Sequence, residues 1–343
     1  MTATGMPHRA GFGAGVGRVF RARETGILIA FLAVTAIATG VNPTFVFSTD
    51  GWRNLLLTPT LLILLAIGEA MVIITRNVDL SVGSIFGLSA WTCGQVYLAF
   101  PHAPIVVIFI VGIVCGALLG LVNGLIVTIA KVPALVVTLG TLYIYRGIAV
   151  LWAGSNLIDP DNLPSDFQSL GHTSIWIIPK LTIIAVVVAV IAGWALRNLR
   201  AGREMYAIGS DPAAATLYGL RTRRRVLTAF ILSGALAGLT GVLFLSYNAG
   251  ASSQSGSGYE LLAVAAAVVG GVAIFGGSGT ILGAVIGALL LNTISNALPV
   301  VGIPDVWQQA ITGALIIAAI ILDRVLLLRS TRKLVIAEEA SHV

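Results

Sequence analysis

The sequence is poor in charge, cysteine and histidine. Only 10% of its 343 residues are Asp, Glu, Lys or Arg, compared with about 25% in a soluble domain. The two cysteines, Cys93 and Cys115, stand in apolar runs, the usual setting of a small packing residue and not of a disulfide framework. The four histidines stand in predicted tails and loops without metal-ligand spacing. These absences exclude an ordinary soluble domain, and we expect no metal site and no histidine-based catalysis.

Hydrophobic residues make up 57% of the chain, and the mean hydropathy is +0.98. Runs such as 105–130 continue without a charge for the roughly 20 residues that a helix needs to cross a hydrocarbon core about 30 Å thick. A transmembrane β-strand would instead alternate over about ten residues. The sequence therefore predicts an all-α, polytopic membrane protein. Its ten predicted transmembrane helices are 26–41, 54–75, 83–100, 104–130, 132–153, 175–196, 226–249, 259–276, 279–300 and 305–323.

The placement of charge predicts the topology. Loops rich in Lys and Arg remain in the cytoplasm, so three basic segments and both termini are predicted to be cytoplasmic, and the acidic loop 154–174 extracytoplasmic. Ten helices are consistent with this topology, because five lead from the N-terminus to the acidic loop, one returns to the loop 197–225, and four more bring the C-terminus to the cytoplasm. The chain then divides into a basic tail (1–25), one transmembrane domain (26–323) with a cytoplasmic loop at 197–225, and a second tail (324–343). The basic residues of these three segments are Arg9, Arg18, Arg21 and Arg23, then Arg197, Arg200, Arg203, Arg221, Arg223, Arg224 and Arg225, and finally Arg324, Arg329, Arg332 and Lys333.

The N-terminal residues allow a second interpretation. Arginines followed by an apolar run and by Ala36, Ile37 and Ala38 imitate a secretory signal peptide. A cytoplasmic basic tail followed by a first transmembrane helix explains the same residues without a cleaved leader, and this is what we expect.

Glycines recur every four residues in two of the predicted helices. Small residues on one helix face allow two backbones to approach closely in lipid, so each stripe predicts a helix-packing seam. A seam along which helices slide during transport is the alternative. The stripes are Gly112, Gly116, Gly120 and Gly124, and then Gly279, Gly283 and Gly287.

A polar break interrupts the apolar sequence between two predicted helices. Residues 76–84 read RNVDLSVGS, with a charge of each sign, an Asn and two serines. Asp79, Ser81 or Ser84 is able to cap the helix that follows. Irregular backbone at membrane depth is also tolerated where it lines a cavity, so the break is equally a candidate for a substrate path.

The longest predicted cytoplasmic loop contains a short helix of its own. Ser210 or Asp211 is the candidate cap, Pro212 suits the first helical position and Gly219 ends the helix. One interpretation is a plug for the groove of a partner protein. The other is a helix lying on anionic lipid, with 221–225 binding headgroups. No phosphate-cradling loop is present, because 276–280 (GGSGT) lacks the following Lys, so this chain is expected to bind no nucleotide.

Four ordered motifs resemble those of the membrane permease subunits of bacterial ATP-binding-cassette importers, in the ribose-type branch that moves monosaccharides. Branched-chain amino acid permeases are relatives, but the DLSVGS run is similar to the sugar branch. Residues 138–147, followed by Leu151 and Trp152, are similar to permeases for rhamnose or for a furanosyl autoinducer. The motifs are 78–84 (VDLSVGS), 132–140 (VPALVVTLG) with Arg146 and Gly147, 258–261 (GYEL), and Gly270 and Gly271 followed by 276–279 (GGSG).

The resemblance implies a complex in the bacterial inner membrane. Two permease chains, identical or paralogous, would be joined to two cytosolic ATPases that carry ATP and Mg, and a periplasmic or lipid-anchored sugar-binding protein would supply the solute. This chain would be half of the pore and no enzyme itself, with no cofactor of its own and no nucleic acid partner. The loop helix would be the coupling helix that docks on the ATPase, through Gly209, Ser210, Asp211, Pro212, Ala213, Ala214, Ala215, Leu217, Tyr218 and Gly219.

The sequence departs from the family pattern at two places. Arg76 and Asn77 stand where two glycines are common, which affects the expectation about the solute. Pro212 stands where Glu is frequent, which affects how the ATPase is held. The candidates for the translocation path are polar residues that also serve as interhelical hydrogen-bonding groups, namely Asp79, Ser81, Asn123, Asn248, Glu260, Asn292 and Asn296.

A different class of transporter is the main alternative. In an ion-coupled secondary transporter, Glu69, Asp79 and Glu260 would be titrating sites near the bilayer midplane. Such a transporter would work without an ATPase.

Overall fold

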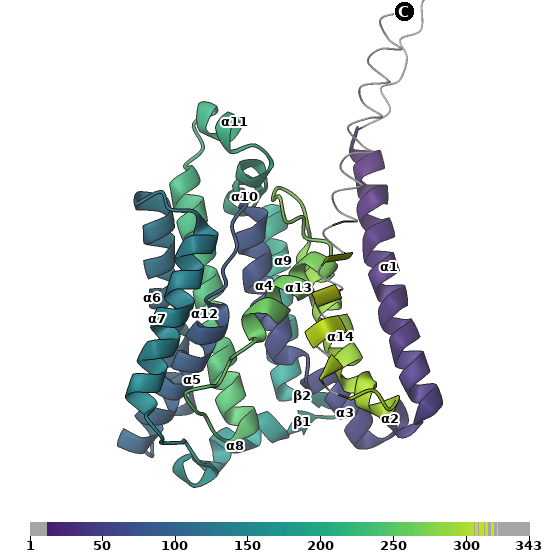
Figure 1. Cartoon of the computed structure of the whole chain (residues 1–343), viewed down its shortest axis with the longest axis vertical. Helices are drawn as coiled ribbons and strands as arrows, with labels where there is room; N and C mark the ends of the chain where they lie inside the picture. The colour runs from purple at the N-terminus through teal and green to yellow at the C-terminus, as the bar shows by residue number, and fades with distance from the viewer. Residues whose placement is uncertain are drawn as a thin grey trace, which may run out of the picture.

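The structure is a computed structural model that describes residues 12–304, then 306, 307, 309–311, 313, 314, 317, 318 and 321, with side chains from residue 24 on. These residues form an elongated helical bundle (Figure 1). The predicted tail 324–343 lies outside the described residues, as do parts of the predicted tail 1–25 and of the predicted helix 305–323.

Helices follow one another along nearly the whole described chain, and one two-stranded hairpin interrupts them. The first half contains α1 (Phe12–Val41), α2 (Thr44–Phe47), α3 (Thr49–Leu57), α4 (Thr60–Ile74), α5 (Val82–Ala99), α6 (Ile105–Ile129) and α7 (Ala134–Ala153). The second half contains the 3-10 helix η1 (Pro160–Asn162), α8 (Ser165–His172), β1 (Ser174–Ile175), β2 (Ile178–Pro179), α9 (Lys180–Asn198), α10 (Arg200–Ser210), α11 (Pro212–Leu217), α12 (Thr222–Asn248), α13 (Tyr259–Val269) and α14 (Ile281–Val300).

Seven helical segments of the described chain are long and apolar enough to cross a membrane, so the chain is a multi-pass membrane protein. They are 24–41, 49–74, 105–129, 134–153, 180–198, 222–248 and 281–300. The predicted helix 83–100 is α5, which has 18 residues but is not among the seven. Figure 1 shows α11 at one end of the bundle and α8 with the hairpin at the other. The side of the membrane on which each end lies stays a prediction.

Several of the predicted helices have different bounds. The helix predicted at 26–41 is part of α1, which begins at Phe12 within the predicted tail, and the helix predicted at 54–75 is divided between α3 and α4. The helix predicted at 259–276 is α13, which ends at Val269 because Gly271 turns the backbone with a φ of +95°. Its 11 residues rise about 16 Å, roughly half of a hydrocarbon core. The helix predicted at 175–196 begins only at Lys180, since 174–179 form the hairpin in which Ile175 pairs with Ile178.

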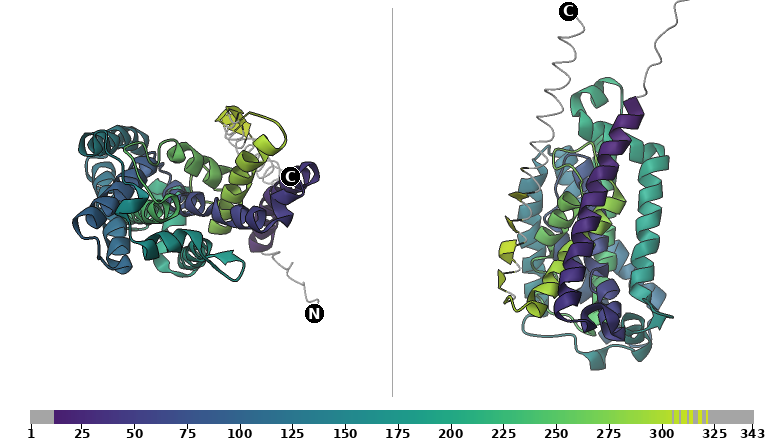
Figure 2. Two further views of the ribbon diagram at one scale, coloured as in Figure 1. Left: turned by 90° about the horizontal axis from the view of Figure 1, so that it is seen from below. Right: turned by 90° about the vertical axis from the view of Figure 1, so that its right-hand side faces the viewer.

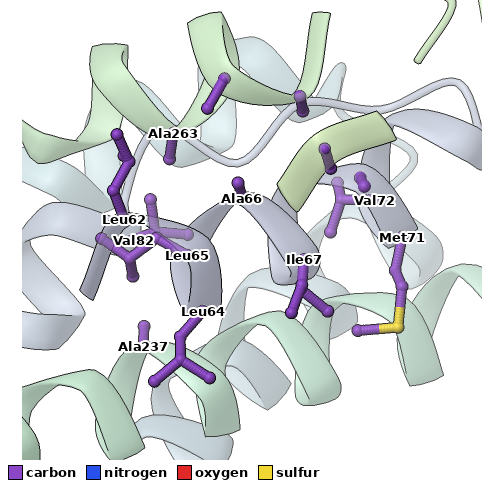
Figure 3. Close-up of a cluster of buried hydrophobic side chains, with 14 of the residues drawn as sticks. Leu62, Leu64, Leu65, Ala66, Ile67, Met71, Val72, Val82, Ala237 and Ala263 are labelled. Atoms are coloured by element: carbon purple, nitrogen blue, oxygen red, sulfur yellow. The ribbon is translucent and has the colours of Figure 1, made fainter. Parts of the chain in front are cut away.

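The helices α4 and α12 form the centre of the bundle. Every residue of α4 is buried, as expected for a helix that is apolar on all sides. Figure 3 shows Leu62, Leu65 and Ile67 of α4 in one cluster with Val82, Ala237 and Ala263 from the surrounding chain. At one edge of the bundle, α1 packs against α14 (Figure 2).

The helices α6 and α12 pack through glycine on both sides. A Cβ added to Gly116 would overlap the carbonyl oxygen of Gly234, and one added to Gly120 would overlap that of Phe230. In return, a Cβ on Gly238 would overlap the carbonyl oxygen of Gly112. Farther along, a Cβ on Gly124 would press on Leu227 and Phe230. The predicted stripe therefore lies against a second glycine pair, Gly234 and Gly238, that the sequence analysis did not single out.

The second glycine stripe lies between α14 and α13. A Cβ on Gly283 would overlap the carbonyl oxygen of Gly270, and one on Gly287 that of Ala266. Gly279 differs from the other two, because it precedes α14 and has a φ of +138°. It belongs to the turn that leads into the helix.

Gly116→Leu is expected to lower the free energy of unfolding by about 1–3 kcal/mol, because the added side chain has no space between α6 and α12. Thermal unfolding of the purified chain in detergent measures this. Gly140→Leu is the matched control, since nothing lies within 4 Å of a Cβ at Gly140 on α7. Equal midpoints for Gly116→Leu and wild type would show that the close approach of the two helices is not required.

Candidate functional site

A polar turn connects α4 to α5, and its Asp79 and Ser81 are fully buried. Figure 1 shows the chain running from the α11 end of the bundle down to the start of α5 as an open segment. Within it, the Asp79 carboxylate accepts hydrogen bonds from the backbone N–H and the hydroxyl of Ser81, at 3.0 and 2.5 Å, and one from Ser233 of α12 at 3.4 Å. Asp79 therefore fixes the turn ahead of α5 and does not cap the first turn of the helix.

The hydrogen bonds continue from this turn into α6 and α7. The Asn123 amide donates to the Ser81 hydroxyl at 2.7 Å, and the Tyr145 hydroxyl donates to the Asn123 carbonyl oxygen at 3.2 Å. Thr138 donates to the backbone carbonyl of Val78 at 3.2 Å. Asp79, Ser81 and Asn123 have no exposed surface. In this conformation they bind one another and hold the break together; their part in a translocation path stays a prediction.

A second carboxylate, Glu69 of α4, lies beneath the turn. Its Oε1 accepts the backbone N–H of Asp79 at 3.1 Å, and its Oε2 has no hydrogen-bond partner among the described residues. The ion pairs of the described chain include neither Glu69 nor Asp79. An unpaired charge buried in protein costs several kcal/mol, so an uncharged side chain of the same shape, glutamine, is expected to be tolerated at position 69.

The starts of α5 and α13 meet beside the segment 250–258. Glu260 accepts the backbone N–H of Gly258 at 3.2 Å, and Arg146 of α7 donates to the carbonyls of Ser253 and Ser255 at 3.2 and 2.7 Å. A Cβ on Gly83 would overlap the Glu260 carboxylate, so that carboxylate lies against the first turn of α5. Helices that begin inside a bundle are a recurrent feature of transporter binding sites.

The two asparagines of α14 bind Thr58. Asn292 and Asn296 donate to its hydroxyl at 2.7 and 3.0 Å, and Thr58 donates to the carbonyl of Asn54 at 2.7 Å. Asn248 lies apart from this pair, is exposed, and donates to the carbonyl of Phe244 at 3.2 Å. Thr58 and Asn296 line a cavity of about 430 Å³ near α2 and α3. Its other polar lining residues are Asn42, Thr44, Ser48, Asp50, Asn54 and Tyr247.

The helix predicted in the long loop is α11. Asp211 caps it by accepting the backbone N–H groups of Ala213 and Ala214 at 2.9 and 3.0 Å, and Pro212 is its first residue. Gly219, with a φ of +73°, turns the chain away after its end. Leu217 and Tyr218 project from it with 88% and 87% of their surface exposed. Two large apolar side chains are thus presented to a partner or to lipid.

The preceding helix, α10, joins α11 to the bundle by close backbone contacts. A Cβ on Gly209 would overlap the carbonyl oxygen of Ile74 at the end of α4, and the same carbonyl accepts the backbone N–H of Gly277 at 3.0 Å. Tyr206 donates to the carbonyl of Gly279 at 2.9 Å. A displacement of α11 would therefore reach the end of α4 and the loop ahead of α14.

Glu204 of α10 forms two ion pairs, one within its own helix and one with α12. Its carboxylate accepts from Arg225 of α12 at 2.6 Å and from Arg200 at 2.7 Å. These hydrogen bonds hold the pKa of Glu204 below its usual range. The ion pairs therefore persist at neutral pH and are lost only when the pH falls through that lowered pKa. The i,i+4 spacing of Arg200 and Glu204 predicts the first of these ion pairs. No spacing in the neighbouring sequence predicts the second, between Glu204 and Arg225.

Comparisons with known proteins identify relatives over most of the chain. Residues 52–320 match a family described as the permease component of branched-chain amino acid transport systems. The chain is 37% identical over 302 residues to the Autoinducer 2 import system permease protein LsrC of Enterobacter sp. (strain 638), covering 88% of this chain and 86% of that protein. It is 36% identical over 301 residues to LsrC of Yersinia pseudotuberculosis serotype O:1b (strain IP 31758), covering 88% and 84%. No solved structure matches the chain significantly.

Glu69→Gln is expected to leave the thermal midpoint in detergent unchanged or raised, because the amide keeps the acceptor for Asp79 and removes a buried charge. Asp79→Ala is expected to lower the free energy of unfolding by about 1–3 kcal/mol for each buried donor left without an acceptor. Thermal unfolding of both variants tests the pair. If Glu69→Gln destabilised the chain as much as Asp79→Ala, the carboxylate of Glu69 would be required in its charged form.

Proposed function

This chain belongs to the family of permease components of branched-chain amino acid transport systems, and on this premise we propose that it forms half of the transmembrane pore of an ATP-driven importer for a monosaccharide or a sugar-like small molecule. The observation that carries the proposal is its similarity over 88% of its length to permeases of autoinducer 2 import systems. A furanosyl solute of that kind is the first candidate.

The proposed complex contains three further kinds of protein. A second permease chain, identical or paralogous, completes the pore in the bacterial inner membrane, and two cytosolic ATPases bind ATP and Mg. A binding protein delivers the solute on the α8 side. The concentration of arginine around α11 supports a cytoplasmic position for that end of the bundle.

The coupling helix in this proposal is α11, together with residues 209–219. The exposure of Leu217 and Tyr218 supports it, because apolar side chains on a short helix outside the bundle fit a groove on a partner. The contact of Gly209 with Ile74 supports transmission of ATPase closure to α4. The polar turn at Asp79 directly follows α4, so a movement of its end alters the geometry of the break.

The proposed path passes the starts of α5 and α13 and opens toward the cavity that Asn296 and Thr58 line. Amide and hydroxyl groups suit a hydroxylated solute, since they donate and accept hydrogen bonds without a charge. In alternating access, the turn around Asp79 and the segment ahead of Glu260 are the parts of the chain that would rearrange. The remaining candidates, Ser81, Asn123, Asn248 and Asn292, would take part as their hydrogen bonds exchange.

Reconstitution in vesicles tests the function directly. With the ATPase and the binding protein present, uptake of labelled furanosyl autoinducer or rhamnose is expected to require ATP and to continue in the presence of an uncoupler. An ion-coupled secondary transporter would give the opposite result, namely uptake by the chain alone that an uncoupler abolishes. Rhamnose and ribose, added as unlabelled competitors, distinguish the solutes.

The double variant Leu217→Ala, Tyr218→Ala is expected to reduce ATP-dependent uptake about tenfold or more, because it removes the exposed side chains that would anchor α11 in the ATPase. Binding of the ATPase and uptake are both measured. Tyr143→Ala is the matched control, because Tyr143 of α7 is 73% exposed at a distance from α11. Wild-type uptake by the double variant would remove the assignment of α11 as the coupling helix.

A further inference from the structure

Two cavities of opposite chemistry follow one another along α12. The first, of about 410 Å³, lies at the start of the helix beneath α11 and is lined by Gly219 and Leu220 together with charged residues. These are Arg200, Glu204, Arg221, Arg224 and Arg225. The second cavity, of about 390 Å³, is almost wholly apolar and lies between α9, α10 and α12. Its lining includes Val188, Leu196, Met205, Leu232 and Leu236.

The register of α12 places both cavities along one face of this helix, and the two together are called the groove below. Arg221 and Arg224 line the basic part, and Thr228, Leu232 and Leu236 continue the same helix face at steps of three to four residues into the apolar part. α10 crosses both parts, since Arg200 and Glu204 line the first, and Gly202 and Met205 the second. The groove thus passes from basic to apolar as it enters the bundle.

The basic part has an excess of positive charge. Glu204 is its one carboxylate and already pairs with Arg200 and Arg225. Arg221 and Arg224 are exposed and form no ion pair within the described residues. The mouth of the groove therefore offers two guanidinium groups to an anion.

We propose that this groove binds one anionic phospholipid, with the phosphate held by Arg221 and Arg224 and an acyl chain along α12 between α9 and α10. The neighbouring surface of α9 supports a lipid, because Val187, Val190 and Trp194 are half exposed or more, as expected of a face toward the bilayer. An acidic segment of a protein partner would neutralise the arginines and leave the apolar part of the groove empty. A phospholipid complements both parts at once, and basic pockets between transmembrane helices at the cytoplasmic surface are suited to such headgroups.

The position of the site gives the lipid a role in the geometry of α11. Gly219 and Leu220 line the basic part directly after α11, and Glu204 and Arg225 connect α10 to α12 across it. A phosphate bound to Arg221 and Arg224 would hold the start of α12 in place, and an acyl chain between α9, α10 and α12 would add an apolar contact among these helices. The lipid would thereby fix the base from which Leu217 and Tyr218 project, whatever protein or surface they contact.

Lipid binding to the purified full chain tests the proposal without any transport assay. The delipidated chain in detergent is titrated with phosphatidylglycerol or with phosphatidylcholine of the same acyl chains, and native mass spectrometry counts the bound lipid. Wild type is expected to retain one phosphatidylglycerol in preference to phosphatidylcholine. Arg221→Gln and Arg224→Gln are each expected to weaken that binding about fivefold, equivalent to roughly 1 kcal/mol.

Two further variants separate the parts of the groove. Arg223→Gln is the matched control, because Arg223 is exposed in the same stretch and does not line the cavity. Ala235→Phe fills the apolar part and is expected to weaken binding of both lipids while leaving the arginines in place. Equal binding of the two lipids by wild type would overturn the proposal, as would equal losses in Arg223→Gln and Arg221→Gln. A loss of ATPase binding, with lipid binding unchanged in the arginine variants, would assign the basic part to a protein partner instead.

Discussion

The structure depends on one constraint, that a backbone polar group at membrane depth must find its hydrogen bond within the protein. The chain leaves its helical path between α4 and α5 and again around α13, and each departure frees N–H and carbonyl groups. The side chains that lie there meet this demand. Asp79 accepts from Ser81, Thr138 donates to the Val78 carbonyl, and Arg146 donates to the carbonyls ahead of α13. The polar residues of the bundle are therefore concentrated at its breaks.

Glycine packing brings these side chains within reach of the break. Asn123 lies one turn from Gly120 on α6, and Ser233 directly precedes Gly234 on α12. Because both glycines are in backbone contact across the seam, Asn123 and Ser233 are both delivered to the turn at Asp79. Wider spacing between α6 and α12 would carry one of them away from it. The hydrogen bonds at the turn thus depend on the close packing of α6 and α12. A substitution in the seam between these helices is therefore expected to affect the turn as well.

The sequence predicts elements better than it predicts their partners. The capped helix α11 and the glycine periodicity of α6 follow from local patterns, because a cap and a helix face are properties of a few neighbouring residues. The end of α13 was missed because Val272, Ala273 and Ile274 continue the apolar run, although Gly271 has already turned the backbone. The pairing of Glu204 with Arg225, and of Asn292 with Thr58, joins residues distant in sequence, and no spacing rule reports such contacts.

The connection of α11 to the bundle determines how a force on it is distributed. α11 contacts the core through α10 on one side and α12 on the other, and Glu204 ties these two helices together. At Gly209 the backbones touch, so no side chain there is able to yield and absorb a displacement. The carbonyl of Ile74 that meets Gly209 also accepts the N–H of Gly277, so the end of α4 and the loop ahead of α14 are joined at this point. Since α4 leads into the turn at Asp79, and α14 carries the two asparagines that bind Thr58, the proposed displacement of α11 would reach the break in the bundle and the helix that borders the polar cavity at its opposite end.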